Sequence, residues 1–343
     1  MSKIQFQCDY NEGAHPRIIQ ALTETNMYQT PGYGEDEFCS EAREVVKEVC
    51  GRPDADVHFL VGGTQTNATV ISSVLKPYQG VLCAASGHIN VHETGAIEHG
   101  GHKVLALPAS EGRISGTQIR AAMASHLAED GPEHMVQPGM VYISFPTEIG
   151  TIYSLSELRD IRSACDEYSL PLFIDGARLG YGLMSDACDL TIKELASIAD
   201  VFYIGGTKQG ALFGEAVVIT RESLKKDFRY CIKQGGGMLA KGRLLGIQFR
   251  ELLRDGLYFE LAAKADSQAM RIRDAFKAKG YSFLVDSPTN QQFPILTAED
   301  IERLDRDFAF SIWQKIDEDH TAVRFCTSWA TLDASVDRLI ASI

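Results

Sequence analysis

Short apolar segments alternate with longer amphipathic stretches between about residues 35 and 220. The short segments, bounded by Gly, Pro or polar positions, predict strands at Asp56–Val61, Gly80–Ala85, Lys103–Leu107, Met140–Ser144, Leu172–Ile174, Val201–Ile204 and Ala216–Ile219. Apolar residues at three-and-four spacing predict helices at Glu37–Cys50, Asn67–Leu75, Ile119–Leu127, Ser156–Tyr168 and Thr191–Ile198. This alternation is typical of a mainly parallel sheet with helices on both faces. We therefore expect the α/β class with a seven-stranded sheet.

A glycine-rich segment, Gln234–Gly237, interrupts the alternation. After it, Leu244–Leu253 and Leu257–Lys279 carry helical patterns, and shorter strand and helix candidates follow to the C-terminus. The pattern predicts two domains. An N-terminal segment and a large α/β domain would occupy residues 1–243, and a small α+β domain would occupy residues 244–343.

Composition and charge narrow the classes of function. The chain has 343 residues, 45% of them hydrophobic, which is enough for a large core. Its net charge of −13 and pI near 5.2 offer no attraction to nucleic acid or to an anionic membrane surface, so neither is expected as a partner. Eight cysteines without a CxxC pair argue against a zinc cluster or a disulfide framework, and the N-terminus lacks a signal-like apolar run. We expect a cytoplasmic protein.

Two charged residues follow predicted strands and carry the strongest chemical signal. Asp175 ends one apolar strand, and a buried acid needs a cationic partner such as the pyridinium nitrogen of pyridoxal phosphate. Lys208 follows another apolar strand, where its amine could form a Schiff base with the cofactor aldehyde. Alone, Asp175 could be a helix N-cap and Lys208 a surface lysine. Together at strand ends, where open α/β sheets bind ligands, they predict a cofactor site.

A glycine turn between a predicted strand and a predicted helix forms a second candidate. Gly63 and Thr64 stand where free backbone N–H groups and a hydroxyl could hold a phosphate. Such a turn often only caps a helix, so the signal is weak by itself. The chain lacks GxGxxG and GxxxxGK[ST] at this turn, which disfavours a dinucleotide or a nucleoside triphosphate.

His88 follows the strand predicted at Gly80–Ala85 and is a third candidate. Its imidazole could stack on a conjugated ring and transfer a proton. The alternative is that His88 and the nearby His92, His99 and His102 are surface or interface histidines. Their spacing does not match a zinc motif, so no metal is expected.

With these residues in view, the sequence resembles the threonine aldolase and β-eliminating lyase family of pyridoxal-phosphate enzymes over most of its length. The motifs that carry the resemblance are Tyr33-Gly-Glu-Asp36, Gly63-Thr64, His88 ahead of Glu93 and Gly95, Asp175-Gly-Ala-Arg178, Lys208, Gly235-Gly-Gly-Met238 and Val323-Arg324-Phe-Cys-Thr-Ser328. The resemblance implies fold type I, the fold of aspartate aminotransferase.

The resemblance also implies roles for the residues around the cofactor. Gly63 and Thr64 would hold the phosphate, His88 would stack on the pyridine ring, Asp175 would pair with its nitrogen, and Lys208 would form the Schiff base. The cofactor expected from this family is pyridoxal 5′-phosphate.

Two arginines and one tyrosine match family positions near the substrate. Arg178 and Arg324 resemble the pair near the cofactor hydroxyl and the substrate carboxylate, and a planar guanidinium suits a carboxylate. Arg324 is the stronger carboxylate candidate. Family members are similar in being homodimers or homotetramers with active sites between subunits, so Tyr33 could serve the neighbouring site.

The chain departs from the family pattern at two places. Where many threonine aldolases have a histidine before the DxAR strand, this chain has Thr147 and Glu148. Where the family often has arginine after GGGM, this chain has Leu239, with Lys241 and Arg243 close by. These differences bear on the substrate more than on the cofactor.

The expected reaction is aldol cleavage of a β-hydroxy-α-amino acid, with L-threonine or L-allo-threonine giving glycine and acetaldehyde. His88 and Glu148 are both candidates for the base, and the sequence does not choose between them. The alternatives are β-elimination or transamination at the same cofactor, and a protein that binds pyridoxal phosphate without turnover.

Overall fold

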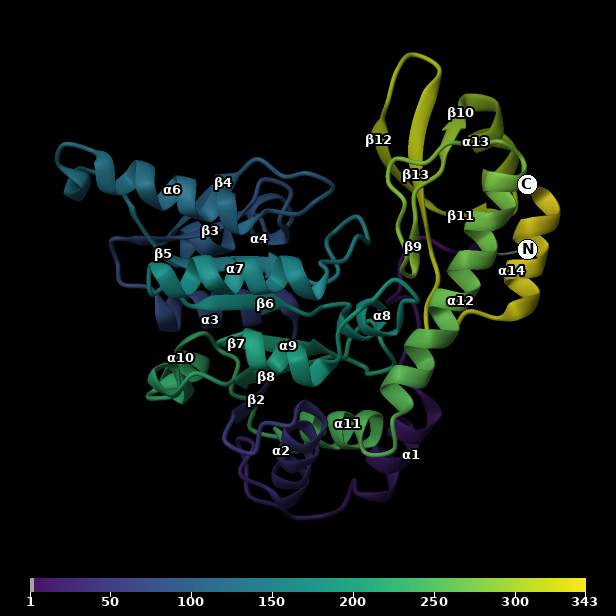
Figure 1. Ribbon diagram of the computed structural model, residues 1–343. Coiled ribbons are helices and arrows are strands. Elements are labelled where there is room, and N and C mark those ends of the chain that lie inside the picture. The colour runs from purple at the N-terminus through teal and green to yellow at the C-terminus, as the bar shows by residue number, and fades with distance from the viewer. Residues whose placement is uncertain (1–2) are drawn as a thin grey trace.

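The computed structural model describes residues 3–343 (Figure 1). Its central sheet has seven strands in the order β2-β8-β7-β6-β5-β3-β4. Their bounds are β2 (Asp56–Leu60), β3 (Gln79–Ala84), β4 (Lys103–Leu107), β5 (Gln137–Ser144), β6 (Leu172–Asp175), β7 (Val201–Gly205) and β8 (Glu215–Ile219). Strand β8 runs antiparallel to both neighbours, and the other pairs are parallel. The predicted α/β class with a mainly parallel, seven-stranded sheet is confirmed.

Helices cover both faces of this sheet (Figure 1). Those before the C-terminal part are α1 (Pro16–Glu24), α2 (Glu37–Cys50), α3 (Gly63–Val74), α4 (His88–Val91), α5 (Ala96–His99), α6 (Gly116–Ala128), α7 (Leu155–Glu167), α8 (Leu179–Met184), α9 (Ile192–Ile198), α10 (Phe228–Gln234) and α11 (Arg243–Leu253). Two short 3-10 turns lie at Pro132–His134 and Glu222–Leu224.

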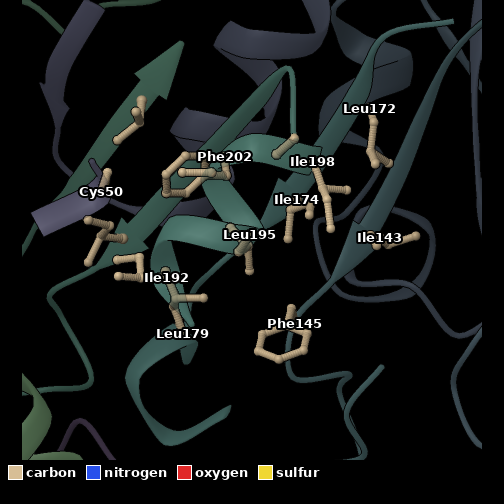
Figure 2. Close-up of a cluster of buried hydrophobic side chains, with 14 of the residues drawn as sticks. Cys50, Ile143, Phe145, Leu172, Ile174, Leu179, Ile192, Leu195, Ile198 and Phe202 are labelled. Atoms are coloured by element: carbon tan, nitrogen blue, oxygen red, sulfur yellow. The ribbon is translucent and has the colours of Figure 1, made fainter. Parts of the chain in front are cut away.

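Successive residues of the central strands point into different hydrophobic clusters, as the period of a strand requires. On β6 and β7, Ile174 and Phe202 join one cluster with helices α2, α7 and α9, part of which is shown in Figure 2. The adjacent Phe173 and Tyr203 join a second cluster with α3 and α10. The sheet is therefore buried on both sides, which explains why its strands read as continuous apolar runs.

Local capping explains why some helices were predicted more accurately than others. Helix α2 matches its predicted bounds, because Asp36 accepts a hydrogen bond from the Cys39 amide at 2.9 Å and Gly51 ends the helix in the left-handed region. Helix α3 begins at Gly63, four residues before its predicted start at Asn67. Its first turn carries no apolar pattern to mark it.

The C-terminal part has its own small sheets and helices (Figure 1). Its elements are α12 (Leu257–Ala278), β9 (Gln291–Gln292), β10 (Ile295–Thr297), α13 (Ala298–Asp305), β11 (Phe308–Ala309), β12 (Ser311–Lys315), β13 (His320–Cys326) and α14 (Asp333–Ser342). Strand β13 pairs antiparallel with β9, β10 and β12, and β11 pairs parallel with the N-terminal β1 (Ile4–Gln5).

A separate hydrophobic cluster that includes Phe276 and Phe325 forms the core of this part. Phe249 and Leu252 of α11 instead pack into the cluster beneath the large sheet. The division between residues 243 and 244 stays a prediction. Within residues 3–343, no helix has the length and apolar character needed to span a bilayer.

Candidate active site

A pocket lies at the carboxyl-end edge of the central strands, where open α/β sheets bind their ligands. It is lined by Gly63, Asn67, His88, Ser144, Pro146, Thr147, Glu148, Asp175, Ala177, Arg178, Tyr203 and Lys208. Six residues singled out from the sequence as cofactor or catalytic candidates meet here, namely Gly63, His88, Glu148, Asp175, Arg178 and Lys208. The fold thus brings together residues that lie up to 145 positions apart in the sequence.

Asp175 is buried at the end of β6 and accepts hydrogen bonds at both carboxylate oxygens. Tyr142 donates to Oδ2 at 2.6 Å and Asn67 to the same oxygen at 3.1 Å. Tyr203 and the Ala177 amide donate to Oδ1, the latter at 3.0 Å. Burial alone would raise the pKa of Asp175, but the two tyrosine hydrogen bonds and the nearby His88 charge bring the pKa below its usual value. Asp175 is therefore held as an anion.

Two glycines allow the ends of β6 and β7 to approach each other. A Cβ atom on Gly176 would lie 1.9 Å from the Tyr203 carbonyl oxygen, and one on Gly205 would lie 2.5 Å from the Ala177 carbonyl oxygen. No side chain fits at such distances, so both positions require glycine. This contact between backbones brings Asp175 and the turn that carries Lys208 to the same pocket.

Lys208 lies in the turn after β7, and its backbone carbonyl accepts a hydrogen bond from Tyr181 at 2.7 Å. Its side-chain amine has no hydrogen-bond or ion-pair partner among residues 3–343. Burial lowers the pKa of Lys208, and the positive charge of Arg178 lowers it further. A lysine with a lowered pKa has a larger neutral fraction, and the neutral amine is the form that attacks an aldehyde.

His88 begins α4 and is oriented by a buried acid. Its Nδ1 lies 2.7 Å from Oε1 of Glu93, and the same oxygen accepts a hydrogen bond from Asn67 at 2.7 Å. Burial would lower the pKa of His88, but the Glu93 hydrogen bond and the charge of Asp175 together raise it above its usual value. His88 is therefore biased toward the protonated form.

Glu148 follows β5 and lies beside His88. Its Oε1 accepts hydrogen bonds from the His88 amide at 2.8 Å and from the Ser144 hydroxyl at 2.6 Å. Burial raises the pKa of Glu148 above the usual value of a glutamate. A carboxylate with a raised pKa in a pocket is suited to accept and return a proton.

Helix α3 starts at the pocket, with Gly62 as an N-cap that makes no side-chain capping bond. The first N–H groups of the helix therefore lack an intrahelical partner. Gly63 lines the pocket, and a Cβ there would lie 3.3 Å from the Tyr203 hydroxyl. The Thr64 side chain is exposed and lines a neighbouring groove instead. Only the backbone of Thr64 thus belongs to the helix start beside the pocket.

Arg178 is paired with a buried acid from the N-terminal segment. Its Nε donates to Oδ2 of Asp9 at 2.7 Å and its Nη2 to Oδ1 at 2.9 Å. Asn290 donates to Asp9 Oδ2 at 2.9 Å. The guanidinium therefore lines the pocket with its charge already balanced by a carboxylate of the protein.

Arg324 and Tyr33 are not among the residues that line this pocket. The Arg324 guanidinium lies 5.1 Å from the ring centroid of Trp313 and donates to Gln291 Oε1 at 3.2 Å. Gln291 in turn reaches the Glu148 carbonyl oxygen at 3.5 Å, so Arg324 lies near the pocket. Tyr33 lines a separate pocket and is 48% exposed.

Sequence reasoning assigned no role to four side chains that hold the candidate residues in place, Glu93, Asp9, Tyr142 and Tyr203. Glu93 carried a signal, since an acid five residues after a candidate histidine lies within reach of it. Asp9 had no such signal, because only the tertiary fold brings the N-terminal segment to Arg178. Tyr142 and Tyr203 lie within apolar strands and read as core residues.

The residues of the pocket fit pyridoxal phosphate. An anionic acid and an amine that has no hydrogen-bond partner among residues 3–343 line the same pocket, and a helix start without a side-chain cap faces the same space. The acid suits the pyridine nitrogen of the cofactor, the amine suits its aldehyde, and the helix start suits its phosphate.

Solved structures of other proteins share the fold. An aspartate aminotransferase double mutant from Thermus thermophilus superposes with a TM-score of 0.72 at 13% identity, over 99% of this chain and 90% of that one. The chain therefore has fold type I.

The comparisons also place the chain within a family. Residues 8–299 match the family model described as beta-eliminating lyase, and the chain belongs to that family of lyases. It is similar to the low specificity L-threonine aldolase of Pseudomonas sp. strain NCIMB 10558, with 29% identity over 99% of this chain and 96% of the relative. It is also similar to the solved structure of Leishmania major threonine aldolase, with a TM-score of 0.96 and 43% identity over 98% of each chain.

Proposed function

We propose that the chain is a pyridoxal-phosphate-dependent aldehyde-lyase that cleaves a β-hydroxy-α-amino acid, with L-threonine or L-allo-threonine giving glycine and acetaldehyde. The observation that carries the proposal is the meeting of Lys208, Asp175, His88 and Glu148 in one pocket. The similarity to threonine aldolases over nearly the whole chain supports the reaction type.

Bound pyridoxal phosphate would supply an electron sink for the bond broken at the substrate Cα. Lys208 would hold its aldehyde carbon, and the Asp175 carboxylate would keep its ring nitrogen protonated. The first N–H groups of α3, at Gly63 and Thr64, would hold the phosphate. His88 would cover one face of the ring.

Glu148 is the base for the β-hydroxyl proton in this proposal. Its carboxyl has a raised pKa, and hydrogen bonds from Ser144 and the His88 amide fix its Oε1. His88 is biased toward the protonated form by Glu93, so it is better suited to donate than to accept a proton. Once Glu148 takes the hydroxyl proton, the Cα–Cβ bond breaks, the aldehyde leaves, and Cα receives a proton to give glycine.

The two arginines would divide the work of holding the substrate. Arg324 is assigned to the substrate carboxylate, since no carboxylate of residues 3–343 is paired with it. Arg178 already has the Asp9 carboxylate as a partner and would act beside the cofactor hydroxyl. Trp313 supports the Arg324 guanidinium from its ring face.

We further propose a homodimer or homotetramer with active sites between subunits, in which the exposed Tyr33 serves the neighbouring site.

We also propose that the small-molecule substrate is an amino acid and that the protein is located in the cytoplasm. The small domain is proposed to begin near residue 244.

Product analysis distinguishes the proposed reaction from its alternatives. The loaded protein is incubated with L-threonine and L-allo-threonine, and acetaldehyde, glycine, ammonia and keto acids are measured. Equal amounts of glycine and acetaldehyde are expected. Ammonia with a keto acid would instead identify β-elimination, and a product formed only with an added keto acid would identify transamination. Absence of both product and spectral change with a wide set of amino acids would identify a cofactor-binding protein without turnover.

A further inference from the structure

Ser144 ends β5 and brings a hydroxyl group to the pocket. Because side chains alternate along a strand, Ser144 and Tyr142, two positions apart, point to the same face of the sheet. In the parallel pairing of β5 and β6, Ser144 lies opposite Asp175. Glu148 follows four residues later and lines the same pocket. The register of the sheet thus places Ser144 close to both the proposed base and the acid at the end of β6.

The Ser144 hydroxyl has two acceptors within hydrogen-bond distance. It donates to Oε1 of Glu148 at 2.6 Å and to the hydroxyl oxygen of Tyr142 at 3.3 Å. A serine hydroxyl carries one hydrogen, so it cannot donate fully to both. Tyr142 cannot supply the hydrogen for this contact, because its own hydroxyl hydrogen is donated to Oδ2 of Asp175 at 2.6 Å. The four side chains therefore form one hydrogen-bonded chain in which the Ser144 hydrogen is shared.

The charge of Glu148 decides which acceptor receives this hydrogen. A carboxylate is a stronger acceptor than a neutral phenol oxygen, so the hydrogen belongs to Glu148 while Glu148 is an anion. A neutral carboxyl is a weaker acceptor, and Tyr142 then competes for the hydrogen. A hydroxyl that accepts a hydrogen bond becomes a better donor, which strengthens the hydrogen bond from Tyr142 to Asp175.

We propose that Ser144 is a positioning residue whose single hydroxyl hydrogen couples the base Glu148 to the Tyr142–Asp175 pair at the cofactor ring nitrogen. When Glu148 takes the proton of the substrate hydroxyl, one O–H bond breaks in the substrate and one forms at the carboxyl. The Ser144 hydrogen then turns from Glu148 to Tyr142, and no bond of Ser144 breaks. The proposal deepens the proposed function and rests on it, because that function makes Glu148 the base.

Other groups around Glu148 act on the same carboxyl. Burial and the charge of Asp175 raise the pKa of Glu148, whereas the hydrogen bonds from Ser144 and from the His88 amide lower it. Removing the Ser144 donor should therefore raise this pKa further. The other titratable groups whose charges interact with Glu148 are Cys83, Tyr142 and Tyr153.

The test measures the protonation of Glu148 in the cofactor-free full-length protein. Infrared difference spectra over a range of pH follow the C=O stretch of protonated carboxyl groups, and the Glu148 band is the one absent from Glu148→Gln. Ser144→Ala removes the shared hydrogen, Ser144→Thr keeps it, and Tyr142→Phe removes the second acceptor. Ser73→Ala is the matched control, because the half-buried Ser73 also donates a hydrogen bond, to the Val70 carbonyl oxygen at 2.7 Å, but lies outside the pocket.

In Ser144→Ala, loss of the donor should raise the apparent pKa of Glu148, with about a tenfold higher affinity for the proton. Tyr142→Phe should lower this pKa, because neutral Glu148 no longer allows Ser144 to form a hydrogen bond with Tyr142. The effect of Tyr142→Phe should be smaller when Ser144→Ala is also present, since part of it passes through the serine hydroxyl. Ser144→Thr and Ser73→Ala should titrate like the wild type, and circular dichroism checks that each variant is folded.

A Glu148 profile unchanged in Ser144→Ala, or a Tyr142→Phe effect of equal size with and without the serine hydroxyl, would overturn the proposal. An unchanged profile in Tyr142→Phe alone would also overturn it, which keeps the test decisive even where Ser144→Ala does not fold. The titration needs neither cofactor nor turnover, so it is separate from failure of the proposed function, which would appear as a cofactor-loaded wild type that forms no acetaldehyde.

Discussion

Replacing Asp9 by asparagine should leave the Arg178 guanidinium buried without its counter-charge. Asp9 is fully buried and makes two hydrogen bonds with Arg178, at 2.7 and 2.9 Å. The variant keeps the shape of the side chain and an oxygen for hydrogen bonding. Any loss of stability therefore reports mainly on the charge.

The size of the effect follows from the pKa of Asp9. Burial raises this pKa, but the charge and hydrogen bonds of Arg178 outweigh burial and lower it from 3.8 to about 2. At about 1.4 kcal/mol per unit, this shift corresponds to roughly 2.5 kcal/mol of stability. Removing one partner of a buried ion pair costs about 3–5 kcal/mol, because the other charge is left unpaired. We expect Asp9→Asn to lower the free energy of unfolding by about 3 kcal/mol at pH 7.

Urea unfolding followed by circular dichroism measures this difference between pH 7 and pH 2. Because the folded pKa of Asp9 lies below the unfolded value, its contribution is present above pH 3.8 and is lost as the pH falls toward 2. The gap between wild type and variant should therefore narrow over that window. Asp286→Asn, which removes an exposed partner of Lys277, is the matched control and should cost less than about 1 kcal/mol.

An Asp9→Asn protein as stable as the wild type at pH 7 would refute this reasoning, and so would a gap that stays constant down to pH 2. Equal losses in the buried and the exposed variant would also contradict it, because the effect would then not depend on burial.

Three further substitutions test other parts of the site. Glu148→Gln should lower kcat about a hundredfold or more. Because the base acts as a carboxylate with a raised pKa, kcat of the wild type should rise with pH, with an apparent pKa above 4.5. The same rise in Glu148→Gln would contradict the assignment of Glu148 as the base. Tyr142→Phe should raise the pKa of Asp175, weaken cofactor binding and lower the free energy of unfolding by about 1–2 kcal/mol. An unchanged cofactor affinity in equilibrium dialysis would contradict the role given to the Tyr142 hydroxyl. Gly176→Ala places a Cβ 1.9 Å from the Tyr203 carbonyl oxygen and should lower Tm by several degrees in calorimetry, whereas an unchanged Tm would show that the strands can separate.

The sequence was sufficient to predict the seven strands of the large sheet and most of its helices, because the central strands are buried apolar runs and the helices carry a clear apolar period. It was not sufficient for strand order or for the antiparallel direction of β8. The antiparallel course of β8 depends on the length and hydrogen bonds of the turn that carries Lys208, and apolar periodicity does not encode direction. Strands β9, β10 and β11 have only two or three residues each, which is too short for a reliable period.

The candidate site could be predicted where a charged residue follows an apolar strand, as Asp175 and Lys208 do. The side chains that set the pKa values of these residues could not be predicted from the sequence. Tyr203 looks like core in the sequence because its ring is buried, yet its hydroxyl holds Asp175. Asp9 becomes meaningful only once the fold has brought it to Arg178.

The most direct test of the central claim is to locate the cofactor on the chain. The protein is loaded with pyridoxal phosphate, reduced with borohydride, digested and mapped by mass spectrometry, with Lys208→Ala treated in parallel. The account predicts a stable phosphopyridoxyl group on Lys208 and none at stoichiometric level in the variant. A stoichiometric label on a different lysine, or its absence from the wild type, would contradict the assignment of this pocket as the active site.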